Sequence, residues 1–116
     1  MLALWTAVVL WASPDTALAR REVDLLLDDL RRSGCRFQRN GSWYDAAKAA
    51  DHLARKRRYL EGHGGVPSAE FFIDNAGSES SWTGRPYQVG CPDRPVRPSR
   101  DWLRERLRLL REKRGR

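Results

Sequence analysis

The two cysteines, Cys35 and Cys91, constrain the fold of this 116-residue chain more than any other sequence feature. They lie far apart in the sequence, so they do not form the C-x-x-C motif of a redox pair, and no nearby histidine completes a zinc site. In an exported protein, an even number of cysteines most simply forms a structural disulfide. We therefore expect a Cys35–Cys91 disulfide, with a metal site and a redox pair as the alternatives.

The N-terminal segment is typical of a signal peptide. Residues 2–12 form an uncharged apolar run, and Ala17 and Ala19 supply small side chains at the two positions that signal peptidase reads. No Lys or Arg precedes the run, but it is shorter than the ~20 residues of a bilayer-spanning helix, so an uncleaved anchor is the less favoured alternative. We expect residues 1–19 to be removed by cleavage after Ala19, leaving residues 20–116 in the periplasm as one domain without a transmembrane segment.

Positive charge is concentrated at the C-terminal end of the chain. The formal net charge is +7, and residues 97–116 hold nine Lys or Arg side chains against three acidic ones. Residues 20–96 are close to charge balance. A basic segment suits nucleic acid, anionic lipid or another acidic partner, and export argues against nucleic acid. A solvated helix face is the plainer interpretation.

Residues 35–44 predict a β-hairpin. Two short segments flank Asn40-Gly41, the preferred pair for a two-residue type I′ turn because both central residues need a positive φ. This turn places Phe37 opposite Tyr44, on one face of the hairpin.

Four segments predict helices: residues 22–33, 45–61, 68–77 and the segment that follows Ser99. In the first of them, apolar residues recur at every third or fourth position from Val23 to Leu30. Asp45, Ser68 and Ser99 are predicted N-caps of the other three, because their side chains can accept hydrogen bonds from the first helical N–H groups.

A third strand is predicted at residues 86–89, shortly before Cys91. If it pairs with the hairpin, Cys35 and Cys91 come within range of each other, so the disulfide and the sheet support the same arrangement. We therefore predict an α+β fold in which about four helices pack on a short antiparallel sheet, formed by the hairpin and one further strand.

Several short motifs follow one another in a distinctive order. After the leader come a Cys-x-Phe-x-x-Asn-Gly-x-x-Tyr segment from Cys35, an Ala-rich helix with His52 and Lys56, Glu-Phe-Phe-Ile from Glu70, Ser-Ser-x-x-Gly-x-Pro-Tyr from Ser80, the second cysteine and a Trp-Leu helix. This order resembles the YfeK-like family of small exported bacterial proteins over nearly the whole mature chain. The resemblance implies a bacterial origin and a periplasmic location, but no activity, because that family has none established.

Six polar or aromatic residues are the candidate ligand-binding residues: Asn40, His52, Lys56, Ser80, Ser81 and Trp82. Together they would supply hydroxyls, a cation and an exposed aromatic ring, which suits an anionic or sugar-like ligand or a protein loop. Each also has a structural interpretation, such as a turn residue or a solvated cation. We predict a non-catalytic binding or interaction module whose partner is an envelope component: a protein, a glycan or an anionic surface.

Two alternative functions remain open. A small hydrolase or transferase would use Ser80 or Ser81 with His52, although no G-x-S-x-G elbow surrounds either serine. Alternatively, the basic last helix would attach the protein to anionic envelope components. The sequence contains no H-x-x-x-H, H-E-x-x-H or repeated Asp loop, so we expect no metal and no cofactor.

Overall fold

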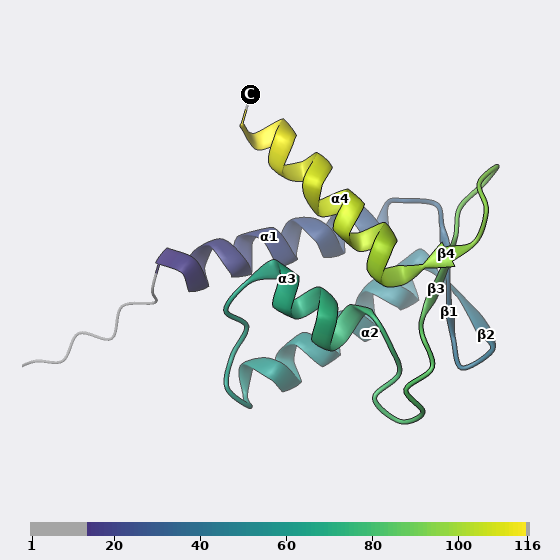
Figure 1. Cartoon of the computed structure of the whole chain (residues 1–116), viewed down its shortest axis with the longest axis horizontal. Coiled ribbons are helices and arrows are strands. Elements are labelled where there is room, and N and C mark those ends of the chain that lie inside the picture. The colour runs from purple at the N-terminus through teal and green to yellow at the C-terminus, as the bar shows by residue number, and fades with distance from the viewer. Residues whose placement is uncertain (1–13, 116) are drawn as a thin grey trace, which may run out of the picture.

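A computed structural model describes residues 14–115, so the apolar run of the predicted signal peptide lies outside the described residues. The elements, in chain order, are α1 (Pro14–Arg31), β1 (Arg36–Arg39), β2 (Ser42–Asp45), α2 (Ala46–Glu61), α3 (Ala69–Phe72), the π-helical turn η1 (Ile73–Gly77), β3 (Gln88–Gly90), β4 (Arg97–Pro98) and α4 (Ser99–Arg114). The helices form one group, and the sheet stands at one end of it, where α2 and α4 begin (Figure 1). The predicted α+β class is confirmed.

The first helix, α1, begins earlier than its apolar pattern indicates. The spacing predicts residues 22–33, whereas the helix spans Pro14–Arg31. The acidic side chain of Asp15 suits the positive end of the helix dipole, and Ala19 is 1% exposed, so the added turns are stabilised by packing. Gly34, at φ 72°, reverses the chain after the helix. No helix in the described part of the chain is long and apolar enough to cross a membrane.

The hairpin of β1 and β2 has the predicted register. Phe37 lies opposite Tyr44, and the turn residues Asn40 and Gly41 have φ angles of 50° and 84°. Both values are in the left-handed region that a type I′ turn requires. The local sequence is therefore sufficient to set the pairing of these two strands.

Two further strands complete an antiparallel sheet of order β2-β1-β3-β4. β3 pairs with β1 as expected, but it covers Gln88–Gly90 rather than residues 86–89. Nothing in the sequence indicates β4, because Pro98 lacks the N–H that a strand ladder uses. The proline is accommodated because β4 lies at the edge of the sheet.

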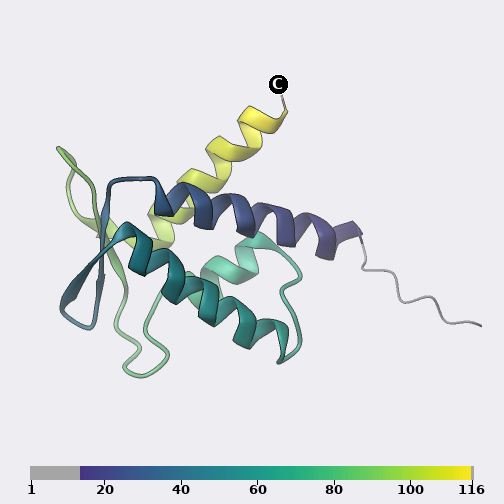
Figure 2. The same cartoon turned by 180° about the vertical axis from the view of Figure 1, so that it is seen from behind.

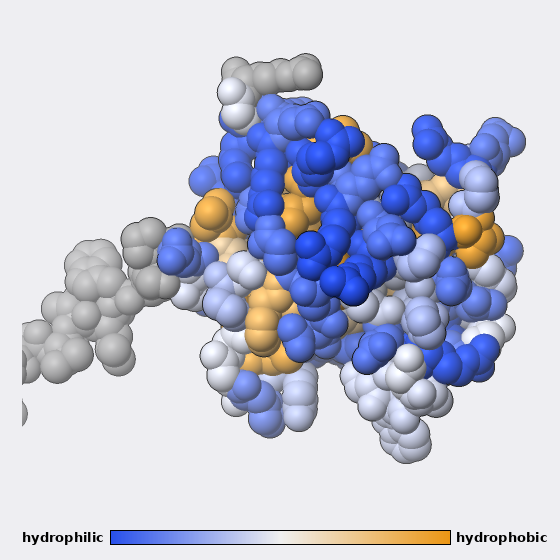
Figure 3. All heavy atoms as spheres, viewed as in Figure 1, coloured by the Kyte–Doolittle hydropathy of each residue, from blue (hydrophilic) through white to orange (hydrophobic). Residues whose placement is uncertain are grey.

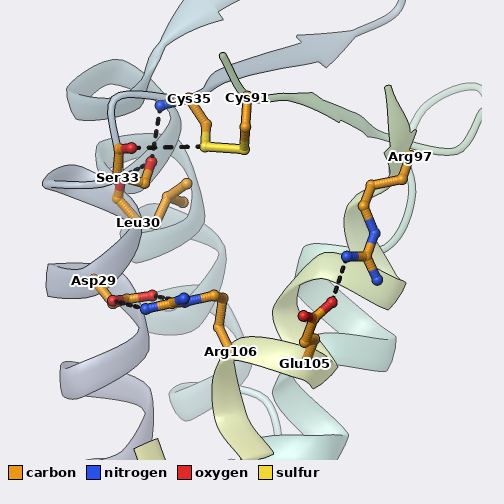
Figure 4. The surroundings of a disulfide bond; sticks show 8 residues. All are labelled: Asp29, Leu30, Ser33, Cys35, Cys91, Arg97, Glu105 and Arg106. Carbon is orange, nitrogen blue, oxygen red and sulfur yellow. Dashed lines mark hydrogen bonds and ion pairs between the residues drawn. A yellow bond between two sulfur atoms is a disulfide. The ribbon is translucent and has the colours of Figure 1, made fainter. Parts of the chain in front are cut away.

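The Cys35–Cys91 disulfide is confirmed, with the two Cα atoms 4.2 Å apart. It joins the residue before β1 to the residue after β3, so it links adjoining ends of two paired strands shortly after α1 ends (Figure 4). Below the disulfide in the same view, Asp29 of α1 pairs with Arg106 of α4 at 2.6 Å (Figure 4). The disulfide therefore ties the ends of β1 and β3 together, and the ion pair ties α1 to α4.

The hydrophobic core lies where the helices meet one another and the sheet (Figure 2). Its largest fully buried side chains include Tyr87, Phe37, Phe72, Leu26, Leu30, Leu53, Ile73 and Leu103. Ala49 and Ala50 of α2 are also buried, and their small size allows close packing of α2. A Cβ atom on Gly77 would lie 2.6 Å from Leu103 Cδ1, so glycine is needed where η1 meets α4.

The helix caps agree with the sequence at two positions and differ at one. Asp45 and Ser68 accept hydrogen bonds from the N–H groups three residues on, as predicted. At α4 the sequence indicates Ser99 as the N-cap, whereas Pro98 holds that position and Ser99 is the first helical residue. The N–H of Ser99 donates instead to the carbonyl of Tyr87 at 2.8 Å. Tertiary contact with the end of the 78–87 segment therefore sets where α4 begins.

Candidate functional site

Four of the six candidate residues take part in hydrogen bonds that join the hairpin turn, α2 and the segment after η1. Asn40 comes from the turn, His52 and Lys56 from one face of α2, and Ser80 from the loop. They form two adjoining clusters. Asn40 bonds to Ser80, whereas His52 and Lys56 both bond to Tyr87, a residue that the sequence indicates only as part of a strand.

Ser80 is a buried hydrogen-bond acceptor that holds the loop after η1 to the hairpin turn. Its Oγ accepts hydrogen bonds from Asn40 Nδ2 at 3.1 Å and from the N–H groups of Trp82 and Thr83 at 3.2 and 3.4 Å. Thr83 Oγ1 donates back to Asn40 Oδ1 at 2.6 Å. Because Ser80 is 5% exposed and three donors converge on its oxygen, its role in the structure is to hold the loop against the hairpin turn.

Tyr87 is the centre of the second cluster and is itself 1% exposed. Lys56 Nζ donates to the Tyr87 hydroxyl at 3.1 Å and to the carbonyl of Glu79 at 3.0 Å. The same ammonium group lies 4.9 Å from the centroid of the Tyr87 ring, within range of a cation–π interaction. His52 Nε2 lies 3.2 Å from the Tyr87 hydroxyl. Lys56 is therefore a fixed component of the fold rather than a freely solvated cation.

His52 makes its shortest hydrogen bond with Arg39. Arg39 Nη1 lies 2.9 Å from His52 Nδ1 and 3.2 Å from His52 Nε2, and because a guanidinium can only donate, the ring nitrogen that bonds to it accepts. In the part of the chain that the structure describes, no hydrogen bond joins His52 to Ser80 or Ser81. The lone pair that a general base would need is occupied by Arg39.

Burial and neighbouring cations shift the proton affinities of this cluster. Burial, with the charges of Arg39 and Lys56 beside it, lowers the pKa of His52 to about 4. Burial and Arg39 lower the pKa of Lys56 to about 8. Burial raises the pKa of the Tyr87 phenol, which therefore stays protonated at neutral pH. At neutral pH the cluster then contains a neutral imidazole, a neutral phenol and an ammonium group.

The remaining two candidates, Ser81 and Trp82, are exposed to solvent. Trp82 is 96% exposed, and its backbone N–H, not its indole, contacts Ser80. The six candidates thus do not line one cavity: four hold the loop and the helix together, and two face the solvent. Among residues 14–115, no group of three His, Cys, Asp or Glu side chains is placed to hold a metal ion.

A small pocket between the hairpin and α2 includes only one of the six candidates. Its volume is about 160 Å³, and it is lined by Phe37, Arg39, Tyr44, Lys48, Ala49, Asp51, His52 and Arg55. The sequence contains a signal for part of it. The alternation of the predicted hairpin places Arg39 on the same face as Phe37 and Tyr44, but it does not show that α2 covers that face.

Each of the six arginines of α4 pairs with a carboxylate. Arg100 and Arg104 pair with Asp74, Arg106 with Asp29, Arg108 with Glu112, Arg111 with Glu22 and Glu70, and Arg114 with Glu22. The Glu22 side chain is only 4% exposed, and its hydrogen bond from Arg111 lowers its pKa. The surface over α4 is hydrophilic (Figure 3), but much of its positive charge is neutralised within the protein.

Comparison with known proteins places the chain in a sequence family. No curated protein and no solved structure matches it. Residues 17–111 match DUF5329, which is described as a family of unknown function. This match fits the expectation of an uncharacterised family, and the narrower resemblance to YfeK-like proteins stays a prediction. Because the match spans most of the chain, this protein belongs to the DUF5329 family.

Proposed function

We propose that this protein is a non-catalytic binding module of the bacterial envelope and that the loop carrying Trp82 is its contact surface. The observation that supports this proposal is the 96% exposure of Trp82. Leaving a large apolar side chain in water is unfavourable, and tryptophan is enriched among the residues that dominate binding interfaces. The bonds between Ser80 and Asn40 hold the loop in place, so a partner that covers Trp82 has little loop entropy to overcome.

The bonding of His52 favours binding over catalysis. The hydrolase or transferase alternative requires a serine hydroxyl that donates to a basic imidazole nitrogen. Here the accepting nitrogen of His52 faces Arg39, and the oxygen of Ser80 accepts bonds from the loop. Ser81 is exposed and has no base beside it among the described residues.

Export to the periplasm is part of this proposal. It is supported by the apolar leader, by the disulfide and by the resemblance to exported proteins. Cleavage after Ala19 would shorten α1 and leave Glu22 in its first turn, where a carboxylate is favourable. The test is the intact mass of the protein from a periplasmic extract, before and after reduction and alkylation. We expect a mass that begins at Arg20, with two thiols only after reduction; retention of Met1, or two free thiols before reduction, would contradict export.

The binding role is tested by co-sedimentation with bacterial envelope fragments. Trp82→Ala should lower the bound fraction several-fold, since truncating a central interface tryptophan commonly costs about 2 kcal/mol or more. Tyr59→Ala is the matched control. Tyr59 is also exposed, at 62%, but it lies near the C-terminal end of α2 and not in the loop that carries Trp82. Equal binding by wild type and Trp82→Ala would refute the proposed contact surface.

The class of partner follows from treating the fragments before mixing. Protease digestion, lipid extraction and muramidase digestion remove a protein, a lipid surface and a glycan respectively, and the treatment that abolishes binding identifies the partner. Attachment through α4 is a second, less supported proposal, because its arginines are already paired with carboxylates. It predicts a loss of binding in Lys113→Gln, a position without an ion-pair partner among the described residues, and no effect of Trp82→Ala.

A further inference from the structure

The pocket between the hairpin and α2 has an apolar floor. Phe37 of β1 and Ala49 of α2 line it, and they are 2% and 1% exposed. Tyr44 of β2 adds an aromatic ring to the lining, and Arg55 of α2 adds a cation. The volume of about 160 Å³ is close to that of cavities, ~150 Å³, that admit a benzene-sized molecule.

Three cationic side chains line this pocket without a carboxylate of their own. Arg39, Lys48 and Arg55 form no ion pair among the residues that the structure describes. The one acidic residue of the lining, Asp51, is paired with Arg31 at 2.5 Å. The pocket therefore has an excess of positive charge, in contrast to α4, where every arginine has an acidic partner.

The guanidinium of Arg39 is held in place with most of its donors unused. Its Cζ lies 5.6 Å from the centroid of the Tyr44 ring, and its Nη1 contacts His52. Within residues 14–115, its Nε and Nη2 groups have no hydrogen-bond acceptor. A guanidinium edge with two free N–H groups matches the two oxygens of a carboxylate.

We propose that this pocket binds a small organic carboxylate, with its apolar or aromatic part on Phe37 and Ala49 and its carboxylate between Arg39, Lys48 and Arg55. The charges select an anion, and the apolar floor and the volume select one with a compact hydrocarbon body. This site is separate from the loop that carries Trp82, so either proposal can fail while the other holds.

The first experiment titrates the full protein with sodium benzoate at neutral pH and low salt, followed by calorimetry and by amide NMR shifts. Benzamide is the matched probe, because it has nearly the same shape and no charge. We expect saturable benzoate binding with the largest shifts at Arg39, Tyr44 and Lys48, and at least ~10-fold weaker benzamide binding. Equal binding of both probes, or binding of neither, overturns the proposal.

A second set of measurements uses charge variants on one helix. Arg55→Met removes a cation that lines the pocket, whereas Arg58→Met removes an exposed cation of α2 that does not line it. Arg55→Met should weaken benzoate binding by roughly 5- to 10-fold, and Arg58→Met by less than about 2-fold. Equal weakening by the two variants would mean that net charge, not the pocket, attracts the anion, and would overturn the proposal.

The nature of the anion is settled by a third probe. Inorganic phosphate carries charge without an apolar body, and we expect it to bind more weakly than benzoate and to compete with it. Phosphate that binds more tightly than benzoate, with the same dependence on Arg55, would assign the pocket to phosphate groups and refute an organic carboxylate.

The imidazole of His52 provides an independent readout of where benzoate sits. Arg39 from β1 and Arg55 and Lys56 from α2 are the charges that face it, and Tyr87 is its hydrogen-bonded neighbour. A carboxylate bound among these cations should raise the pKa of His52 from about 4. The titration of His52, followed by NMR with and without benzoate, should therefore shift to higher pH, and an unchanged titration at saturating benzoate overturns the assignment to this pocket.

Discussion

The last helix and the hairpin–α2 face both carry many cations, but only one of them is balanced by acidic side chains. Each arginine of α4 has a carboxylate within 4.0 Å, contributed mainly by α1 and by the α3–η1 segment. On the hairpin–α2 face, defined here by Arg39, Lys48, His52, Arg55 and Lys56, no side chain forms an ion pair among the described residues. Net charge along the sequence therefore does not locate the surface that is free to attract an anion.

The difference between the two regions follows from where the acidic residues fold. Asp29 and Glu22 of α1 are brought against α4 at 2.6 and 2.7 Å, so these arginines stabilise the fold. Among the residues that line the pocket between the hairpin and α2, only Asp51 is acidic, and it is paired with Arg31. Unpaired cations near buried groups are unfavourable for folding, and groups with perturbed pKa values such as His52 and Lys56 cluster at functional sites.

The largest effect is expected from removing the disulfide, which should weaken one region more than the other. The double variant Cys35→Ala, Cys91→Ala should lose up to about 4 kcal/mol of unfolding free energy, from the entropy of the long loop that the bond closes. Urea unfolding measures the loss. Hydrogen exchange should accelerate first in β1 and β3, while α1 and α4 stay linked by Arg106 and Asp29. Uniform acceleration would show that the two regions do not differ in this way.

A smaller loss is expected when the buried carboxylate beneath α4 is neutralised. Glu22→Gln should reduce the unfolding free energy by about 2 kcal/mol, because Arg111 and Arg114 lose the acceptor that compensates them. Glu112→Gln is the matched control, since its partner Arg108 is an exposed neighbour on the same helix; there we expect a loss of at most about 0.5 kcal/mol. Similar losses of unfolding free energy in the two variants would show that the buried pair of Glu22 stabilises α4 no more than the exposed pair of Glu112 does.

The two regions should also respond to acid in different pH windows. His52 has a pKa of about 4 when folded against 6.5 when free, so the unfolded chain binds more protons between these values and stability falls as the pH drops from 6.5 to 4. We expect a loss of about 1–2 kcal/mol for this half-buried ring. Glu22 and Glu70 have lowered pKa values, so their stabilisation is lost only as the pH falls below about 4.5.

Unfolding by urea at a series of pH values separates these contributions. His52→Gln should flatten the slope between pH 6.5 and 4 and leave the loss at lower pH unchanged. His63→Gln is the control, since His63 is exposed and stacks on Tyr59. An unchanged slope in His52→Gln would mean that the ring is not protected from protonation by its neighbours.

The smallest expected effect compares one arginine from each region. Arg104→Gln should lose about 0.5 kcal/mol because it removes a two-bond contact with Asp74. Arg55→Gln, which removes an unpaired cation, should change stability by less than this or increase it slightly. Added salt should reduce the loss in Arg104→Gln, because it screens the exposed pair. If Arg104→Gln and Arg55→Gln lost the same unfolding free energy in low salt, the paired and unpaired arginines would not differ in their contribution to stability.

Features that depend on neighbouring residues could be predicted from the sequence. The positive φ that Asn40-Gly41 accepts sets the hairpin register, and the side chains of Asp45 and Ser68 cap the helices that follow them. The disulfide could also be predicted, because the cysteine count and the leader together indicate an oxidising compartment. In each case the deciding interaction lies within a few residues or follows from a single chemical pairing.

The candidate site could be predicted only in part. Asn40, Ser80, His52 and Lys56 do come together, but their polar atoms bond within the protein, which leaves Ser81 and Trp82 as the exposed candidates. The partners of these side chains lie far along the chain, so no local pattern shows which hydrogen bonds are already made.

The sequence by itself therefore determined the α+β class, the hairpin, two of the helix caps and the disulfide, because local backbone preferences and cysteine chemistry are sufficient for them. Only the tertiary structure decided where α4 begins, that β4 forms, and which cations are neutralised. Those outcomes depend on which acidic or carbonyl groups the packing of distant elements brings within hydrogen-bonding distance. Charge is a property of the residue, but its compensation is a property of the fold.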